Sequence, residues 1–120
     1  MPDISLSKTV LDILHLDVAK ELMFTGRVVD GEEAMRLGLA TRVSEDPLAD
    51  ALALAATIAG KNPHAISAGK KLLDEAPALS VKEAFLLETE LQLGILGSAN
   101  NMEAVQANMQ KRPPVFQDPD

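Results

Sequence analysis

Residues 80–96 of this 120-residue chain read SVKEAFLLETELQLGIL. Ser80, followed three residues later by Glu83, forms a capping box, in which the hydroxyl and the carboxylate each bind a free backbone amide at a helix start. Beyond the box, apolar side chains recur at helical spacing on one face: Ala84, Leu87, Leu91 and Ile95. A second face carries Leu86, Leu93 and Leu96. An apolar surface this wide predicts a helix that is buried on two sides.

Start signals for further helices occur on the N-terminal side of this stretch. Asp46-Pro47 and Asn62-Pro63 each place a capping side chain before a proline at the first helical position. Asp30 is predicted to cap a short helix that ends before Gly38, and Asp17 to cap a segment over residues 18–24.

The C-terminal side repeats the pattern. Asn100 and Glu103 offer a second capping box, for a last helix that Pro113-Pro114 ends. Only residues 39–43 have a strand-like composition, and that run is too short to found a sheet. The sequence therefore predicts an all-α chain of about six to seven short helices.

Composition agrees and excludes several functions. Apolar residues make up 47% of the chain, with three Phe and neither Trp nor Tyr, so the core is aliphatic and suits helix-on-helix packing. A net charge of −7 without aromatic platforms argues against nucleic-acid binding. No apolar run approaches membrane-spanning length, and cysteine is absent, which excludes thiolate nucleophiles and iron–sulfur sites. We expect a cytoplasmic protein without membrane attachment.

Searches for catalytic and metal-binding residues find no convincing candidate. His15 and His64 each lack a second ligand three or four residues away, so no metal is expected. Of the carboxylate pairs, Glu32-Glu33 suits a helix N-terminus, and the others are typical of solvated surface. The residues alone predict a helical domain with no catalytic group.

The order of the local motifs is more informative. Residues 19–27 read AKELMFTGR, residues 33–43 read EAMRLGLATRV, residues 62–65 read NPHA, and residues 111–116 read KRPPVF. This series resembles the crotonase (enoyl-CoA hydratase/isomerase) superfamily, over essentially the whole chain and in the family's order. The resemblance implies the C-terminal helical oligomerisation domain of that fold, without the ββα spiral that precedes it.

The resemblance also implies which part of the family's fold serves assembly and which part serves catalysis. Residues 1–45 resemble the end of the crotonase core, and residues 46–120 resemble the C-terminal assembly domain, within one compact unit. In the family, the spiral supplies the oxyanion hole and the catalytic carboxylates that hydrate or isomerise enoyl-CoA in fatty acid metabolism. This chain lacks both elements, so we expect it to contain no catalytic residue. The resemblance implies that the coenzyme A thioester is a substrate and that no cofactor is needed.

One binding residue is carried over by resemblance. Lys111 matches a family lysine that reaches across a subunit boundary toward the adenine and phosphate region of CoA, while Asn108 replaces an aromatic residue that helps to close the acyl pocket. The simpler interpretation is that Lys111 and Arg112 complement a helix C-terminus. Near the N-terminus, Pro2-Asp3 resembles a family P-D-G-G turn whose glycines are Ile4 and Ser5 here.

Three functional hypotheses remain open from the sequence. The chain is the helical portion of a crotonase, which assembles as a trimer-type homo-oligomer and closes an acyl-CoA pocket. Alternatively, it is a subunit of a split crotonase whose N-terminal half is a separate chain. The third hypothesis is an unrelated helical interaction module.

Overall fold

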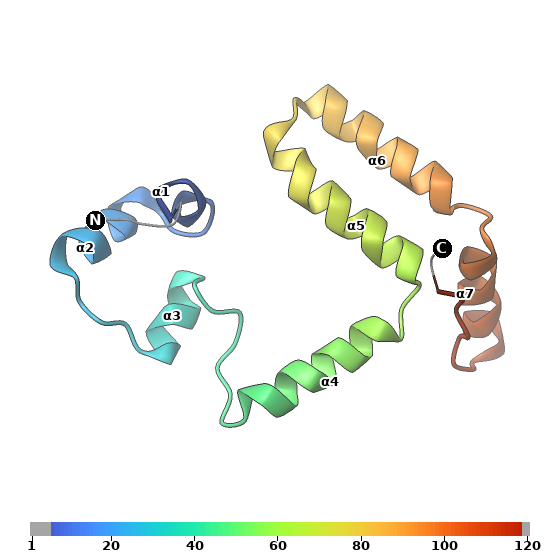
Figure 1. Ribbon diagram of the computed structural model, residues 1–120, viewed down its shortest axis with the longest axis horizontal. Coiled ribbons are helices and arrows are strands. Elements are labelled where there is room, and N and C mark those ends of the chain that lie inside the picture. The colour runs from blue at the N-terminus through green and yellow to red at the C-terminus, as the bar shows by residue number, and fades with distance from the viewer. Residues whose placement is uncertain (1–5, 119–120) are drawn as a thin grey trace. The chain divides into compact units, whose positions relative to one another are not determined.

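The structure is a computed structural model that describes residues 6–118. Over these residues it holds seven α-helices, two 3-10 turns and no strand, which confirms the all-α prediction and the expected number of helices (Figure 1). The elements are α1 (Leu6–Thr9), η1 (Val10–Asp12), α2 (Leu16–Thr25), α3 (Gly31–Leu37), α4 (Pro47–Ala59), α5 (Pro63–Glu75), η2 (Ala76–Ala78), α6 (Val81–Ile95) and α7 (Ala99–Gln110). The predicted turn at Pro2-Asp3, with Ile4 and Ser5, lies outside the described residues.

The chain divides into two compact units, Met1–Asp50 and Ala51–Asp120. The boundary that the sequence analysis placed after residue 45, and the expectation of one compact body, stay predictions.

The first unit has a small aliphatic core, to which η1, the link after it, α2 and the end of α3 contribute. Val10, Leu14 and Ala19 are buried, and Val18, Leu22 and Leu37 pack against them. The prediction that Asp17 caps α2 is wrong, because the helix begins at Leu16 and His15 precedes it as the capping residue. Asp17 instead lies in the first turn, where its negative charge interacts favourably with the positive end of the helix dipole.

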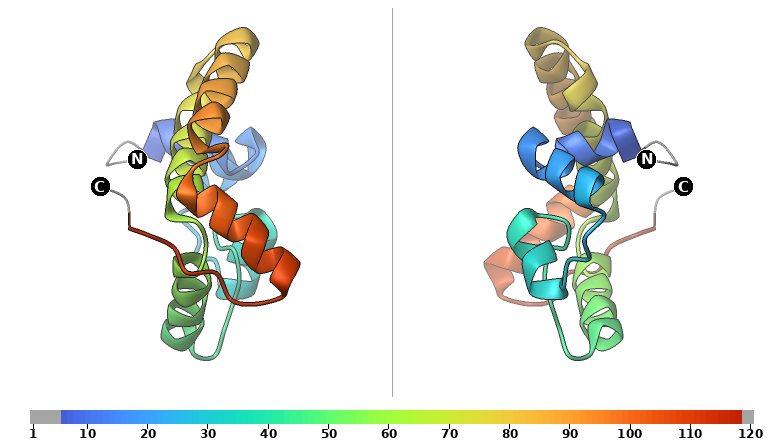
Figure 2. Two further views of the ribbon diagram at one scale, coloured as in Figure 1. Left: turned by 90° about the vertical axis from the view of Figure 1, so that its right-hand side faces the viewer. Right: turned by 90° about the vertical axis from the view of Figure 1, so that its left-hand side faces the viewer.

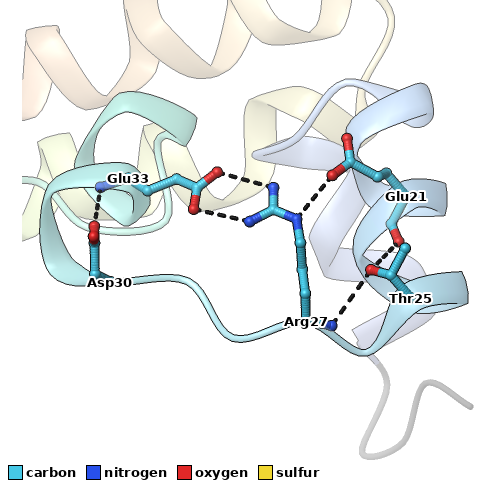
Figure 3. A network of polar contacts seen from close by, with 5 residues as sticks. All are labelled: Glu21, Thr25, Arg27, Asp30 and Glu33. Atoms are coloured by element: carbon cyan, nitrogen blue, oxygen red, sulfur yellow. Dashed lines mark hydrogen bonds and ion pairs between the residues drawn. The ribbon is translucent and has the colours of Figure 1, made fainter.

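Arg27 joins α2 to α3 in a network of polar contacts (Figure 3). Its guanidinium binds both carboxylate oxygens of Glu33, at 2.8 and 2.9 Å, and its Nε donates to Glu21 at 2.8 Å. Asp30 caps α3 as predicted, accepting from the Glu33 amide at 2.8 Å. Arg27 lowers the pKa of the Glu33 carboxyl, and this network fixes how the chain turns between the two helices.

In the second unit, α5 and α6 pack as a helical hairpin (Figures 1 and 2). The capping box of α6 is confirmed: Ser80 Oγ accepts from the Glu83 amide at 3.3 Å, and the Glu83 carboxylate accepts from the Ser80 amide at 2.9 Å. Asn62 caps α5 as predicted, accepting from the His64 amide at 3.0 Å. The face of α6 toward the hairpin is half-buried and consists of Ala84, Leu87, Leu91 and Ile95.

Helix α4 differs from the other helices in its surface. All thirteen of its residues are exposed, and Asp50 is its single charged residue. Leucine, isoleucine and alanine occupy every side of it, with Leu48 and Leu52 exposed by 70% and 62%. A helix that is apolar all round is typical of a buried position, so α4 offers a surface suited to contact with other protein.

Candidate functional site

The start of α7 differs from its predicted form. The capping box expected from Asn100 and Glu103 is wrong, because Ser98 caps the helix by accepting from the Asn101 amide at 3.3 Å. The helix therefore begins before Asn100, and both side chains of the expected box bind residues that follow the helix. Figure 2 shows this following segment turning back along α7.

Glu103 binds the segment after the helix through three hydrogen bonds. Arg112 donates to its two oxygens at 2.6 and 2.8 Å, and the Val115 amide donates at 2.8 Å. The hydrogen bonds from Arg112, and then the one from Val115, lower the pKa of the Glu103 carboxyl to about 2. The ion pair in turn raises the pKa of Arg112, so its charge is engaged within the chain.

Asn100 holds the same segment further along. It is 3% exposed, its Oδ1 accepts from the Gln117 amide at 2.8 Å, and its Nδ2 donates to the Gln117 carbonyl at 2.8 Å. These two bonds fix the orientation of the amide, so Nδ2 also donates to Nδ1 of His64, 3.1 Å away. His64 thus serves a structural contact between α5 and α7.

Lys111 has a left-handed backbone, with φ 55° and ψ 35°. It is the one non-glycine residue with positive φ in the described part of the chain. Arg112 N donates to Ala107 O at 3.0 Å and Lys111 N to Asn108 O at 3.3 Å, the helix-ending pattern that favours glycine at this position. A side chain here costs about 1–2 kcal/mol, and such strain occurs often at functional positions. Its side chain is exposed, and no ion pair recorded for residues 6–118 involves it.

A hollow of about 330 Å³ is lined by Arg112, the residue that follows Lys111 in the chain. Its walls come from the link between α4 and α5, from α7 and from the segment after it, and consist of Gly60, Lys61, Asn62, Ala104, Ala107, Asn108, Arg112, Pro114 and Phe116. Asn108 lines this hollow, and Lys61 adds a positive charge. The sequence analysis missed Lys61, whose one signal was its position directly before the Asn62 cap.

A second hollow, of about 370 Å³, lies between α5 and α6. Its walls are mainly aliphatic, and Glu88 is its charged residue. A negative charge on apolar walls disfavours phosphate. Of these two hollows, the one lined by Arg112 is therefore the better candidate for an anionic ligand.

No helix between residues 6 and 118 has the length and apolar character needed to cross a membrane. No three His, Asp or Glu side chains of this part gather as metal ligands do. The expected absence of a metal stays a prediction.

The chain is similar to several known proteins. It is 40% identical over 109 residues to the "Probable enoyl-CoA hydratase EchA12" of Mycobacterium tuberculosis H37Rv, an overlap of 83% of this chain and 36% of that protein. The crystal structure of an enoyl-CoA hydratase from Polaromonas sp. JS666 superimposes with a TM-score of 0.88 at 26% identity, covering 97% of this chain and 46% of the other. A "probable enoyl-CoA hydratase/isomerase" from Mycobacterium abscessus gives a TM-score of 0.86 at 32% identity, with 99% and 48% covered. No protein-family model matches the chain.

Together, the fold and these similarities define the chain as a helical portion of the fold that enoyl-CoA hydratases adopt. The chain belongs to the crotonase superfamily and corresponds to a C-terminal part of its members. It spans less than half the length of the three proteins named above. The hypothesis of an unrelated helical module is therefore wrong.

Proposed function

We propose that the chain is the helical assembly and CoA-pocket-closing portion of an enoyl-CoA hydratase/isomerase-family protein that acts on acyl-CoA thioesters. The exposed apolar surface of α4 carries the proposal. A helix without a polar face gains stability only when other protein covers it, so this chain works within a larger assembly. The relatives are longer chains, and this chain matches less than half of each.

Three glutamates engaged in structural contacts are unsuited to acid catalysis. Glu33, Glu83 and Glu103 each have a lowered pKa, because each carboxylate accepts hydrogen bonds from an arginine or a helix-capping serine. A general acid working near neutral pH needs the opposite shift. We expect the acids and the oxyanion hole to come from the ββα portion of the family's fold.

Lys111 is the proposed contact with CoA. It lies at the end of α7, directly before Arg112, which lines a hollow with a further positive charge at Lys61, and it retains a side chain where the backbone favours glycine. A lysine binds phosphate as a point charge, worth about 1–3 kcal/mol, and salt weakens the contact. Alone it supports only millimolar or weaker binding of CoA, so the rest of the pocket must come from other protein.

The proposal is tested by supplying the portion of a relative that this chain does not match. Hydration of crotonyl-CoA is measured with this chain, with the part of the M. tuberculosis EchA12 relative that the chain does not match, and with both together. We expect the two to associate and turnover to occur only in the mixture, with Lys111→Ala raising KM more than it lowers kcat. An associated mixture without turnover, or two chains that do not associate at micromolar concentration, would contradict the proposal.

A further inference from the structure

Asn62 caps α5 with one end of its side-chain amide and leaves the other end free. Its Oδ1 accepts from the backbone amides of His64 and Ala65, at 3.0 and 3.4 Å, and these bonds fix the orientation of the side chain. The opposite end is Nδ2, a donor for which no hydrogen bond is recorded within residues 6–118. Because Asn62 is 8% exposed, a donor without an acceptor at this position is costly.

This free donor opens onto the hollow of about 330 Å³ that Asn62 lines. Among the described residues, no buried side-chain nitrogen or oxygen lacks a hydrogen-bond partner, so Nδ2 itself reaches an open surface. The hollow is the open surface that Asn62 borders. A ligand in the hollow therefore meets an N–H donor that the helix cap holds in a fixed orientation.

The charged residues of the lining leave one positive charge without a counter-charge. Lys61 is exposed and belongs to no ion pair recorded for residues 6–118. Arg112 binds both carboxylate oxygens of Glu103, so its charge is balanced within the chain. None of the described lining residues is Asp or Glu, although the chain has a net charge of −7. The hollow therefore attracts an anion and neutralises a single negative charge.

Much of the remaining lining is apolar and includes Ala104, Pro114 and Phe116. Walls of this kind bind an apolar ligand body and disfavour a charge that is left without a partner. A phosphate monoester carries nearly two negative charges at neutral pH, one more than Lys61 balances, whereas a carboxylate carries one. The hollow therefore suits a carboxylate with an apolar body better than it suits a phosphate.

We propose that this hollow binds a small monocarboxylate with an aliphatic body. The carboxylate pairs with the Lys61 ammonium and accepts from Asn62 Nδ2, and the aliphatic part lies against Ala104 and Phe116. Lys111 is not a lining residue, so the site does not use the residue proposed to contact CoA. The inference goes beyond the proposed function and does not rest on it.

Titration of hexanoate into the isotope-labelled whole chain, followed by NMR, tests the site. We expect the side-chain amide resonance of Asn62 to shift, with a dissociation constant in the millimolar range because one ion pair and one donor carry the polar contact. Hexanamide has the same aliphatic body without the charge and should bind at least roughly ten-fold more weakly. Inorganic phosphate should also bind more weakly than hexanoate.

Two substitutions remove the polar contacts and keep the cap of α5. Lys61→Gln removes the ammonium and should raise the dissociation constant for hexanoate roughly ten-fold. Asn62→Asp keeps an oxygen that caps the helix and replaces the Nδ2 donor by a negatively charged oxygen, so hexanoate binding should be lost. Lys71→Gln is the matched control, because it makes the same change of charge as Lys61→Gln at an exposed position of α5 outside the lining. Circular dichroism checks that each variant keeps its helical content.

Four outcomes would overturn the site. Hexanoate leaves the Asn62 side-chain resonance of the wild type unmoved, hexanamide binds as tightly as hexanoate, phosphate binds more tightly than hexanoate, or hexanoate binding survives Asn62→Asp. Free CoA that displaces hexanoate from the wild type would show that the hollow belongs to the CoA contact, and it would contradict a separate carboxylate site.

Discussion

Asn100 binds both backbone polar groups of Gln117, seventeen residues further along the chain. Its Oδ1 accepts from the Gln117 amide and its Nδ2 donates to the Gln117 carbonyl, each at 2.8 Å. The amide side chain of Asn100 thus makes the same pair of hydrogen bonds to the Gln117 backbone that a neighbouring strand makes in a β-sheet. Because Asn100 is 3% exposed, water replaces these bonds poorly when they are lost.

Asn100→Ala should therefore lower the free energy of unfolding by about 2–3 kcal/mol, because it removes three hydrogen bonds at a buried position. The released segment, residues 113–118, should lose protection from amide hydrogen exchange while α5 and α6 keep theirs. Chemical denaturation and hydrogen exchange measure the two effects.

His64→Ala is the matched control, because it removes only the bond between His64 and Asn100. We expect a loss of about 0.5–1.5 kcal/mol and continued protection of Gln117. Equal losses for the two variants would show that Asn100 does not hold the segment.

The ion pair between Glu103 and Arg112 predicts a dependence of stability on pH. The pKa of the Glu103 carboxyl is lowered from 4.5 to about 2 by Arg112 and the Val115 amide. Its stabilising contribution is therefore complete above pH 4.5 and declines as the pH falls from there to about 2. Thermal unfolding of the wild type and of Glu103→Gln should differ most at neutral pH and converge near pH 2. A difference that stays constant over this range would contradict the assigned role.

Because the backbone of Lys111 is left-handed, replacing this residue by glycine should raise the stability of the chain and weaken its binding of CoA. Lys111→Gly should stabilise the chain by about 0.5–1 kcal/mol, since glycine adopts a positive φ without strain but loses more conformational freedom on folding. The same substitution removes the ammonium, so it should weaken the affinity for CoA in the restored assembly. Thermal unfolding and calorimetric titration measure the two effects.

Lys111→Ala separates strain from charge, because alanine loses the ammonium and keeps the strained backbone. It should weaken CoA binding as much as Lys111→Gly does, without the gain in stability. CoA binding that survives both substitutions would show that the ligand site lies elsewhere.

Local signals predicted most of the fold, and distant contacts account for the errors. The caps at Asp30, Asn62 and Ser80 each act within three residues, so the sequence shows both the cap and the amide that it binds. Glu103 resembled a capping residue equally well, but Arg112, nine residues further along, binds its carboxylate instead. A choice between a local amide and a distant guanidinium depends on the tertiary fold.

The candidate site was less predictable. Lys111 was identified by resemblance alone, and nothing in its neighbourhood predicted a left-handed lysine in place of the usual glycine. Lys61 and Asn108 line one hollow because the link before α5 lies beside α7 there. Helical periodicity describes the faces of each helix, and it does not say which faces come together.

In the proposed function, this chain contributes assembly and a CoA contact but no chemistry. The most direct measurement is the absorbance of crotonyl-CoA in the presence of the purified chain alone. We predict no protein-dependent loss of the enoyl-CoA absorbance, since an acid or base beside an oxyanion hole is required. Turnover that disappears when a carboxylate of this chain, such as Glu33, is changed to glutamine would contradict the claim.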